Sequence, residues 1–206
     1  MPTNVVPDIV IGRLPIYLRA LTRMQELGQE ITSSQELGQR LGIGSAQIRK
    51  DLSHFGEFGK QGTGYEISYL RDQIAKILHV DRDWTLALVG FGDLGQAILH
   101  YGGFIGKGFH IEAIFDNDPD KIGQVEEKIT IRSLDDLTQV ISEQKISIAI
   151  VAVPAGAAQE VADKLIEVGV RAILNYAPIT LSVPDGIQVQ YIDPIMHLQR
   201  MAYYLE

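Results

Sequence analysis

Apolar residues recur at helical spacing along the first part of the chain. They predict a helical segment over residues 8–27, which Gly28 ends because glycine favours the left-handed backbone of a helix C-terminus. Pro15 has no N–H to donate, so it either bends this segment or begins its main helix. The apolar positions are Ile9, Leu14, Leu18, Leu21 and Leu27.

Two shorter helices are expected next, joined by a tight turn. Residues 33–36 (SSQE) have the pattern of a capping box, which predicts a helix over residues 34–41. Residues 42–44 (GIG) are expected to form the turn, and Ser45 to cap a third helix that ends near residue 54. Two short helices around a glycine-containing turn predict a helix-turn-helix.

A glycine-rich stretch, residues 58–65, follows these helices and predicts a hairpin, the wing of a winged helix. We expect Phe55 and Phe58 to pack this wing onto the core. A fourth helix is predicted over residues 68–78. The short charged stretch 79–84 comes next, and we place a domain boundary there.

The rest of the chain alternates between strand and helix patterns, which is typical of a doubly wound α/β domain with a parallel sheet. Residues 147–153 are nearly all apolar, as expected for a strand buried on both faces of such a sheet. We predict strands over 85–89, 110–115, 147–153 and 171–174, helices over 93–101, 133–144 and 155–168, and a last helix from about residue 194.

A glycine-rich turn follows the first of these strands. It reads Gly90-Phe91-Gly92-Asp93-Leu94-Gly95, the GxGxxG pattern of dinucleotide-binding turns. In that pattern the first glycine permits the turn, the second lets the backbone approach a pyrophosphate, and the third lets helix and strand pack closely. Because a strand precedes the turn and a helix follows it, we interpret it as a nucleotide site rather than an ordinary α/β turn.

An acidic residue ends the second predicted strand. Asp116 lies 21 residues after Gly95, where it is placed to accept hydrogen bonds from a ribose. Asp118 and Asp120 follow without an arginine, so a 2′-phosphate would meet three carboxylates and no counter-charge. The sequence therefore favours NAD(H) over NADP(H).

Composition excludes several classes of protein. The 206 residues, 46% of them hydrophobic, suffice for one large domain or two small ones. No cysteine is present, which excludes disulfides, zinc–thiolate sites and thiol switches and indicates a cytoplasmic protein. No run of 18 apolar residues predicts a membrane span, and the first residues lack the basic start of a signal peptide.

The net charge of −8 is unevenly distributed. Residues 1–80 carry nine basic and eight acidic residues, whereas residues 81–206 carry nine basic and eighteen acidic residues. The first part can therefore present a basic face although the whole chain is acidic. Its net charge is small, so we expect one copy to bind DNA weakly and a dimer to double the phosphate contacts.

The helix expected at Ser45 carries side chains suited to reading DNA. Arginine and lysine match guanine and phosphates, and glutamine matches adenine. We predict DNA contacts from Ser45, Gln47, Arg49, Lys50 and Ser53. The alternative is an ordinary solvated helix face.

The sequence does not indicate catalysis. A dehydrogenase needs an acid or base near the nicotinamide, and the candidates have no spacing that points to one: His100, His110, His197, Tyr101 and Tyr176. The second part, of about 120 residues, has room for one mononucleotide-binding half and little more. We therefore expect nucleotide binding without turnover.

Taken together, these segments closely resemble the Rex family of bacterial redox-sensing transcriptional repressors. The resemblance runs from end to end of the chain in the family's order. The matching stretches are 13–19 (RLPIYLR), 46–56 (AQIRKDLSHFG), the GFGDLG turn, 115–119 (FDNDP), 153–154 (VP) and 173–178 (ILNYAP).

The resemblance implies a homodimer that binds double-stranded operator DNA when NADH is scarce relative to NAD+ and releases it when NADH binds. It implies a winged-helix DNA-binding domain over residues 1–80 and a Rossmann NAD(H)-binding domain over residues 81–192. Residues 193–206 would be a dimerisation helix exchanged between subunits. Their apolar stripe could instead fold back on its own domain; it comprises Ile195, Leu198, Met201, Ala202 and Leu205.

The resemblance also implies roles for single residues. Arg19, Tyr101 and Asp193 match positions that exchange partners between the two states. We expect the nicotinamide near Tyr101 and near four further residues, and Lys60 of the wing in the minor groove. The four residues are Val153, Pro154, Ala177 and Pro178.

Two positions depart from the family pattern. Gln61 stands where the family usually has a second basic residue, which leaves the minor-groove contact to Lys60. Gly102 replaces a proline in the loop after Tyr101 and should loosen that loop.

Two other functions remain open. One is an NAD-dependent oxidoreductase or a CoA-binding Rossmann protein whose N-terminal helices serve assembly. The other is a scaffold with a relic nucleotide fold, which would bind no NADH. The match over residues 46–56 and the missing catalytic constellation favour the repressor.

Overall fold

The computed structural model of the chain describes residues 6–59, 63–104 and 106–205. It divides into two compact units between Arg82 and Asp83. Lys60 and Gln61, the expected tip of the wing, lie outside the described residues.

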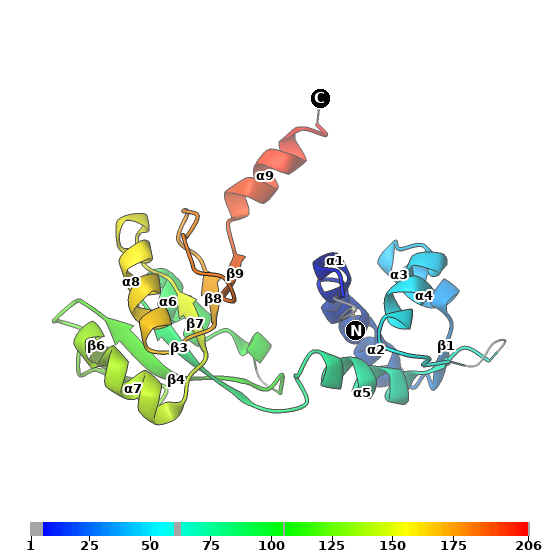
Figure 1. Ribbon diagram of the computed structural model, residues 1–206, viewed down its shortest axis with the longest axis horizontal. Helices are drawn as coiled ribbons and strands as arrows, with labels where there is room; N and C mark the ends of the chain where they lie inside the picture. The colour runs from blue at the N-terminus through cyan, green and yellow to red at the C-terminus, as the bar shows by residue number, and fades with distance from the viewer. Residues whose placement is uncertain (1–5, 60–62, 105, 206) are drawn as a thin grey trace. The chain divides into compact units, whose positions relative to one another are not determined.

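The first unit is mainly helical (Figure 1). Pro15 lies in the first turn of its longest helix, so it begins that helix instead of bending it. The elements are α1 (Asp8–Ile11), α2 (Leu14–Glu26), β1 (Ile31–Thr32), α3 (Ser34–Leu41), α4 (Ser45–Ser53), β2 (Tyr65–Glu66) and α5 (Ile67–Ile77).

The helix-turn-helix forms where the sequence places it. The Ser33 hydroxyl accepts a hydrogen bond from the Glu36 N–H at 3.1 Å and caps α3. Gly42 ends that helix in the left-handed conformation, with φ of 68°. The expected cap of α4 is wrong: Gly44 occupies the cap position, and Ser45 is the first helical residue, with no capping bond from a side chain.

β2 pairs antiparallel with β1, which precedes α3 in the chain, and Thr32 lies opposite Tyr65. The sequence did not predict this partner strand, which lies more than 30 positions upstream. The tip of the expected hairpin lies outside the described residues. Phe55 and Phe58 pack against the hydrophobic core of the unit, as expected.

The second unit contains a seven-stranded sheet. Counted in chain order, its six parallel strands have the order 3-2-1-4-5-6, that of dinucleotide-binding sheets. A short antiparallel strand lies at one edge. Across the sheet the strands are β5 (Val125–Glu126), β6 (Ile129–Ser133), β4 (Phe109–Asp116), β3 (Trp84–Val89), β7 (Ile148–Val151), β8 (Ala172–Asn175) and β9 (Gln188–Tyr191).

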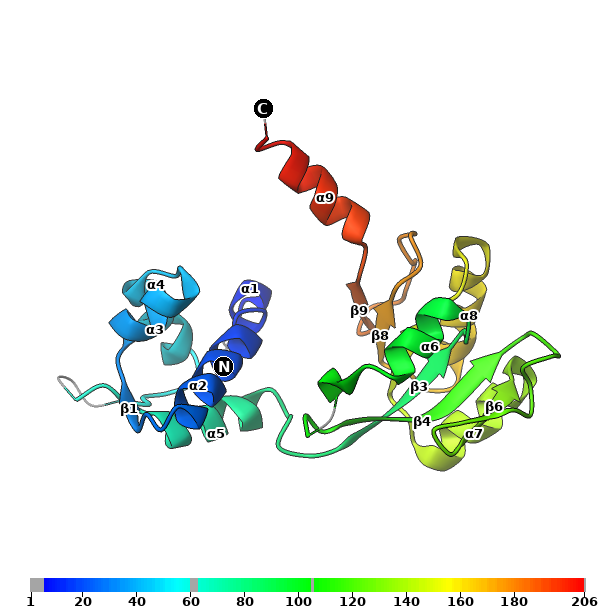
Figure 2. The ribbon, with the colours of Figure 1, turned by 180° about the vertical axis from the view of Figure 1, so that it is seen from behind.

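Helices cover both faces of this sheet, which makes it doubly wound. Leu86 and Leu88 of β3 face α6 (Asp93–Leu99), whereas Ala87 and Val89 face the opposite layer. That layer consists of α7 (Leu137–Gln144) and α8 (Ala155–Glu167). These two helices lie in front of the sheet in Figure 1, and α6 lies in front of it in Figure 2.

The sequence underestimated the extent of this sheet. It predicted one mononucleotide-binding half and little more, but β8 and β9 complete a second half without a helix between them. β6 was missed, and residue 133, expected to begin a helix, ends that strand. Two single 3-10 turns were also missed, η1 (Gly102–Phe104) and η2 (Leu134–Asp136).

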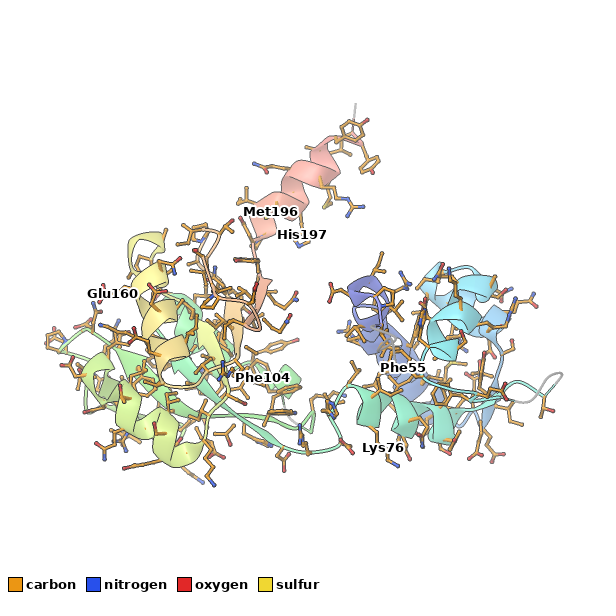
Figure 3. The ribbon with its side chains drawn as sticks, viewed as in Figure 1. Phe55, Lys76, Phe104, Glu160, Met196 and His197 are labelled. Atoms are coloured by element: carbon orange, nitrogen blue, oxygen red, sulfur yellow. The ribbon has the colours of Figure 1, made fainter. Side chains whose placement is uncertain are left out.

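The last helix, α9 (Pro194–Ala202), has none of its residues buried. Figure 1 shows it leading away from the sheet of its own unit, and Figure 3 shows its side chains, Met196 and His197 among them, projecting around it. Met196 is 63% exposed and Leu198 57%. The helix therefore does not fold back on its own sheet, and Leu205, counted in the apolar stripe, lies beyond its end.

Candidate nucleotide site and DNA-reading helix

The three glycines of the turn after β3 have different surroundings. A Cβ on Gly90, whose φ is 94°, would lie 2.5 Å from the carbonyl oxygen of Ala152, and a Cβ on Gly95 would lie 2.1 Å from the carbonyl oxygen of Gly90. A Cβ on Gly92 would meet nothing within 4 Å. Gly90 and Gly95 thus allow close packing of strand, turn and helix, while Gly92 leaves its backbone open to a ligand.

Asp116 joins the end of β4 to this turn. Its buried carboxylate accepts a hydrogen bond from the Phe91 N–H at 2.6 Å and another from the Asp118 N–H at 2.9 Å. Phe91 is itself buried beneath the turn. Asp93 and Leu94 are exposed beside Gly92. The acid expected to bind a ribose therefore also fixes the shape of the glycine turn.

A lysine stands beside this acid, which corrects one sequence inference. The Lys121 ammonium lies 3.6 Å from the Asp116 carboxylate and 3.4 Å from that of Asp118. No arginine stands next to Asp116 in the sequence, which therefore predicted no counter-charge. The short loop after β4 folds back and brings Lys121 to the carboxylates, so a 2′-phosphate would meet one cation there.

The opposite side of the site is built on β7 and β8, which extend the sheet beyond β3. Because the carboxyl ends of parallel strands meet at one edge, Val153 and Pro154 after β7 lie at the same edge as the glycine turn. Ala177 and Pro178 follow β8 there, the first buried and the second exposed.

Asn175, at the end of β8, organises the loop that contains Ala177 and Pro178, and sequence reasoning missed it. Its buried amide donates to the carbonyl oxygens of Ala177 and Ile179, at 3.0 and 3.1 Å, and accepts from the Ala177 N–H at 3.0 Å. The sequence did contain a signal for this role, because Asn175 is a polar residue at the end of an otherwise apolar strand.

Tyr101 lies just after α6 and is 63% exposed. Its ring stands edge-on to Phe104, with centroids 5.5 Å apart. Burial raises the pKa of Tyr176, and the electrostatic effect of Tyr101 raises it further. Tyr101 is thus free to meet a ligand.

Two histidines considered as acid or base candidates lie elsewhere. The Nε2 atom of His100 lies 3.7 Å from a carboxylate oxygen of Glu127, and the Nε2 atom of His110 lies 3.1 Å from a carboxylate oxygen of Asp83. Both line a groove of about 380 Å³ on the α6 side of the sheet that extends to the start of β4, the end away from the glycine turn. His197 is exposed on α9. In the described chain, no cluster of histidines and carboxylates could hold a metal ion.

Four of the five candidate DNA-reading side chains of α4 are exposed, and Ser45 is partly buried. Three of the exposed ones already have partners. The Gln47 amide donates to Asp51 at 2.7 Å, the Arg49 guanidinium to the Ser34 hydroxyl at 2.9 Å, and the Ser53 hydroxyl to a backbone carbonyl of its own helix at 2.7 Å. Lys50 is exposed as well. One polar face therefore presents amide, guanidinium and ammonium groups.

Asp51 anchors this helix to the rest of the unit. Its carboxylate, which is fully buried, accepts bonds from Arg13 Nε at 2.5 Å, from a terminal nitrogen of the Arg13 guanidinium at 2.7 Å and from the Tyr17 hydroxyl at 2.6 Å. Burial alone would raise the pKa of Asp51, but the bonds from Arg13, Tyr17 and Gln47 outweigh it and hold that pKa below its usual range.

Comparison with known families agrees with the two units. Residues 5–53 match the family described as "Putative DNA-binding protein N-terminus", and residues 81–179 match the family described as "CoA binding domain". None of the helices in the part of the chain that the structure describes is long and apolar enough to cross a membrane.

Individual relatives match nearly the whole chain. A redox-sensing transcriptional repressor Rex from Roseiflexus sp. is 53% identical over 97% of this chain and 90% of its own length. The Rex from Chloroflexus aurantiacus is 52% identical, with 98% and 96% covered. The crystal structure of RSP in complex with β-NAD+ and operator DNA is similar with a TM-score of 0.93 and 35% identity, covering 98% of this chain and 94% of RSP.

The carboxylate of Asp116 and the ammonium of Lys121 should act in opposite directions on cofactor choice. Asp116→Ala should weaken NADH binding and narrow the difference between NADH and NADPH, because it removes a ribose acceptor and a negative charge. Lys121→Gln should widen that difference by up to about fivefold, since a partly exposed ion pair is worth about 1 kcal/mol. Fluorescence titration with each nucleotide measures both effects.

Lys128→Gln is the matched control, because it removes the same charge at the exposed turn between β5 and β6. It should leave the NADH to NADPH ratio unchanged. Equal affinity of the unmodified protein for the two nucleotides would contradict the prediction.

Proposed function

The chain belongs to the Rex family of redox-sensing transcriptional repressors, and we propose that it senses the NADH/NAD+ ratio, binding operator DNA when NADH is low and releasing it when NADH binds. One observation carries this: a single solved relative, RSP in complex with both β-NAD+ and operator DNA, matches 98% of the chain at a TM-score of 0.93. RSP has also been solved with β-NADH, and that structure matches with a TM-score of 0.88.

The two ligands would use the two units of the chain. The pyrophosphate would approach the backbone at Gly92, and the adenosine ribose would bind near Asp116. The nicotinamide would lie toward Tyr101 and the loops after β7 and β8. The operator would meet α4 in its major groove through Gln47, Arg49 and Lys50.

Binding of NADH can release DNA only if it contacts the two states of the protein differently. We infer that Tyr101, Asp193 and Arg19 form this difference: Asp193 accepts a hydrogen bond from Tyr101 when NADH is bound and pairs with Arg19 of the partner subunit when it is not. Asp193 caps α9, accepting from the Ile195 N–H at 2.9 Å. A bond to Asp193, from Tyr101 or from Arg19 of the partner subunit, would therefore act on the first turn of α9.

A homodimer joined through α9 is part of this proposal. A helix with exposed isoleucine, leucine and methionine side chains requires a partner surface, and its own unit does not supply one. A second copy of the chain would cover it and would place two copies of α4 on the half-sites of a palindromic operator.

We propose that the protein is a cytoplasmic regulator without enzymatic activity. The relatives are named as transcriptional repressors, and the histidines of the second unit pair with surface carboxylates or lie on α9, away from the glycine turn. Hydride transfer from bound NADH to a substrate would instead favour an oxidoreductase.

DNA binding should depend on Arg49 and Lys50. Changing both to alanine should abolish operator binding while NADH affinity stays within about 1 kcal/mol, because the two sites lie in separate units. Gel shift or fluorescence anisotropy measures the first effect and nucleotide titration the second.

Arg23 and Lys76 provide a control with the same change of charge, since both are exposed on α2 and α5 of the same unit. Their double alanine variant should keep specific binding. Joint loss of DNA and NADH binding in the Arg49 and Lys50 variant would show that α4 is structural instead.

The dimer should depend on the last helix. Deleting residues 193–206 should give monomers that still bind NADH but bind DNA poorly, because palindromic half-sites need two readers. Retained NADH binding shows that the truncated chain is folded. A truncated protein that sediments as a dimer would refute the role of α9.

Release by NADH should depend on the hydroxyl of Tyr101. Tyr101→Phe keeps the ring against Phe104 and removes only the hydrogen-bond donor, so operator binding without NADH should stay intact and release by NADH should be blunted. Titrating NADH into the protein–operator complex measures this. Release at the same NADH concentration as in the unmodified protein would exclude Tyr101 from the switch.

A further inference from the structure

The buried carboxylate of Asp51 touches a side chain on the DNA-reading face as well as the core. Three of its four hydrogen bonds come from Arg13 and Tyr17, at the start of α2. The fourth comes from the amide nitrogen of Gln47, one turn earlier on α4, at 2.7 Å. A side chain with no exposed surface thus contacts an exposed one.

This contact sets the orientation of the Gln47 amide. An ionised carboxylate accepts hydrogen bonds and donates none, and the donors around Asp51 keep it ionised by holding its pKa low. Rotating the Gln47 amide by half a turn would place its Oε1 next to the carboxylate oxygen of Asp51. Both atoms are acceptors, so no hydrogen bond could form between them. The nitrogen is therefore held inward, and Oε1 is left to accept a bond from elsewhere.

The outward groups of Gln47 match some bases and oppose others. Oε1 needs a donor, which in the major groove is the exocyclic amino group of adenine or cytosine. Guanine and thymine present oxygen acceptors at that place. The remaining N–H of the amide can also donate to N7 of adenine, which makes adenine the base with two matching groups.

We propose that Asp51 is a positioning residue for base recognition, which holds the Gln47 amide so that it reads an amino-bearing base, adenine foremost, in the operator. The inference rests on the proposed DNA-binding function. It makes a buried residue without access to DNA responsible for part of the sequence specificity. The competing reading is an i, i+4 side-chain pair that only stabilises α4.

Base preference distinguishes the two readings. The unmodified protein, without NADH, is used to select duplexes from a library of random sequence, and the selected sites are compared with those of Gln47→Ala. We expect one position of each half-site to lose a preference for adenine of about five- to 150-fold, while the other positions keep theirs. Weaker binding with an unchanged preference at every position would overturn the proposal.

Asp51→Asn tests the positioning step. Asparagine can donate as well as accept, so either atom of the Gln47 amide can face it, and the preference at the same position should relax. In the Gln47→Ala background, Asp51→Asn should change no base preference further. Tyr17→Phe is the matched control: it removes one donor from Asp51 and lowers the melting temperature but leaves the bond to Gln47, so the preference should persist. If Asp51→Asn and Tyr17→Phe both relax the base preference at this position, Asp51 has only a structural role.

A measurement on the unmodified protein covers the case in which Asp51→Asn does not fold. The side-chain amide protons of Gln47, assigned from their loss in Gln47→Ala, should exchange with solvent several-fold more slowly than those of other exposed glutamines. Exchange at the same rate would overturn the fixed orientation. If the protein selects no sequence, the proposed function itself fails; if it binds an operator that NADH releases but Gln47→Ala changes no preference, only this inference fails.

Discussion

The hydrogen bonds accepted by the buried carboxylate of Asp116 hold the nucleotide site together. β4 and β3 are parallel neighbours, so their carboxyl ends meet, and Asp116 on one strand reaches the Phe91 N–H just after the other. That bond fixes the turn in which Gly92 remains open and Gly90 and Gly95 pack closely. The strand order then brings the loops after β7 and β8 to the same edge, so a ligand at the turn also meets them.

The first unit also contains a buried carboxylate that accepts several hydrogen bonds. Asp51 is more deeply buried than Asp116, and its donors come from the start of α2 and from its own helix. A buried carboxylate without such donors would cost several kcal/mol, so each of these acids requires its partners to be in place. Both residues therefore impose one arrangement on a surface that must recognise a ligand: the glycine turn in one unit and the polar face of α4 in the other.

The second unit does not cover the apolar side chains of its last helix, α9. Its apolar side chains are exposed, and its first turn is capped by Asp193, the residue that we propose as the switch. The same segment would thus join two chains and report the bound nucleotide. In the proposed dimer, coupling this interface to a helix cap would let a single hydrogen bond act on the placement of both DNA-reading helices.

The sequence by itself determined the elements whose signals are local. The Ser33 cap and Gly42 bound α3 over residues 34–41, as predicted, and the glycine turn lies between a strand and a helix as its pattern requires. The family resemblance identified the two functions. Only the tertiary structure decided the pairing of β1 with β2, the second half of the sheet, the ion pair of Lys121 with Asp116 and the bonds from Arg13 and Tyr17 to Asp51. These depend on short strands with little periodicity and on side chains that the fold alone brings together, and neither leaves a pattern along the chain.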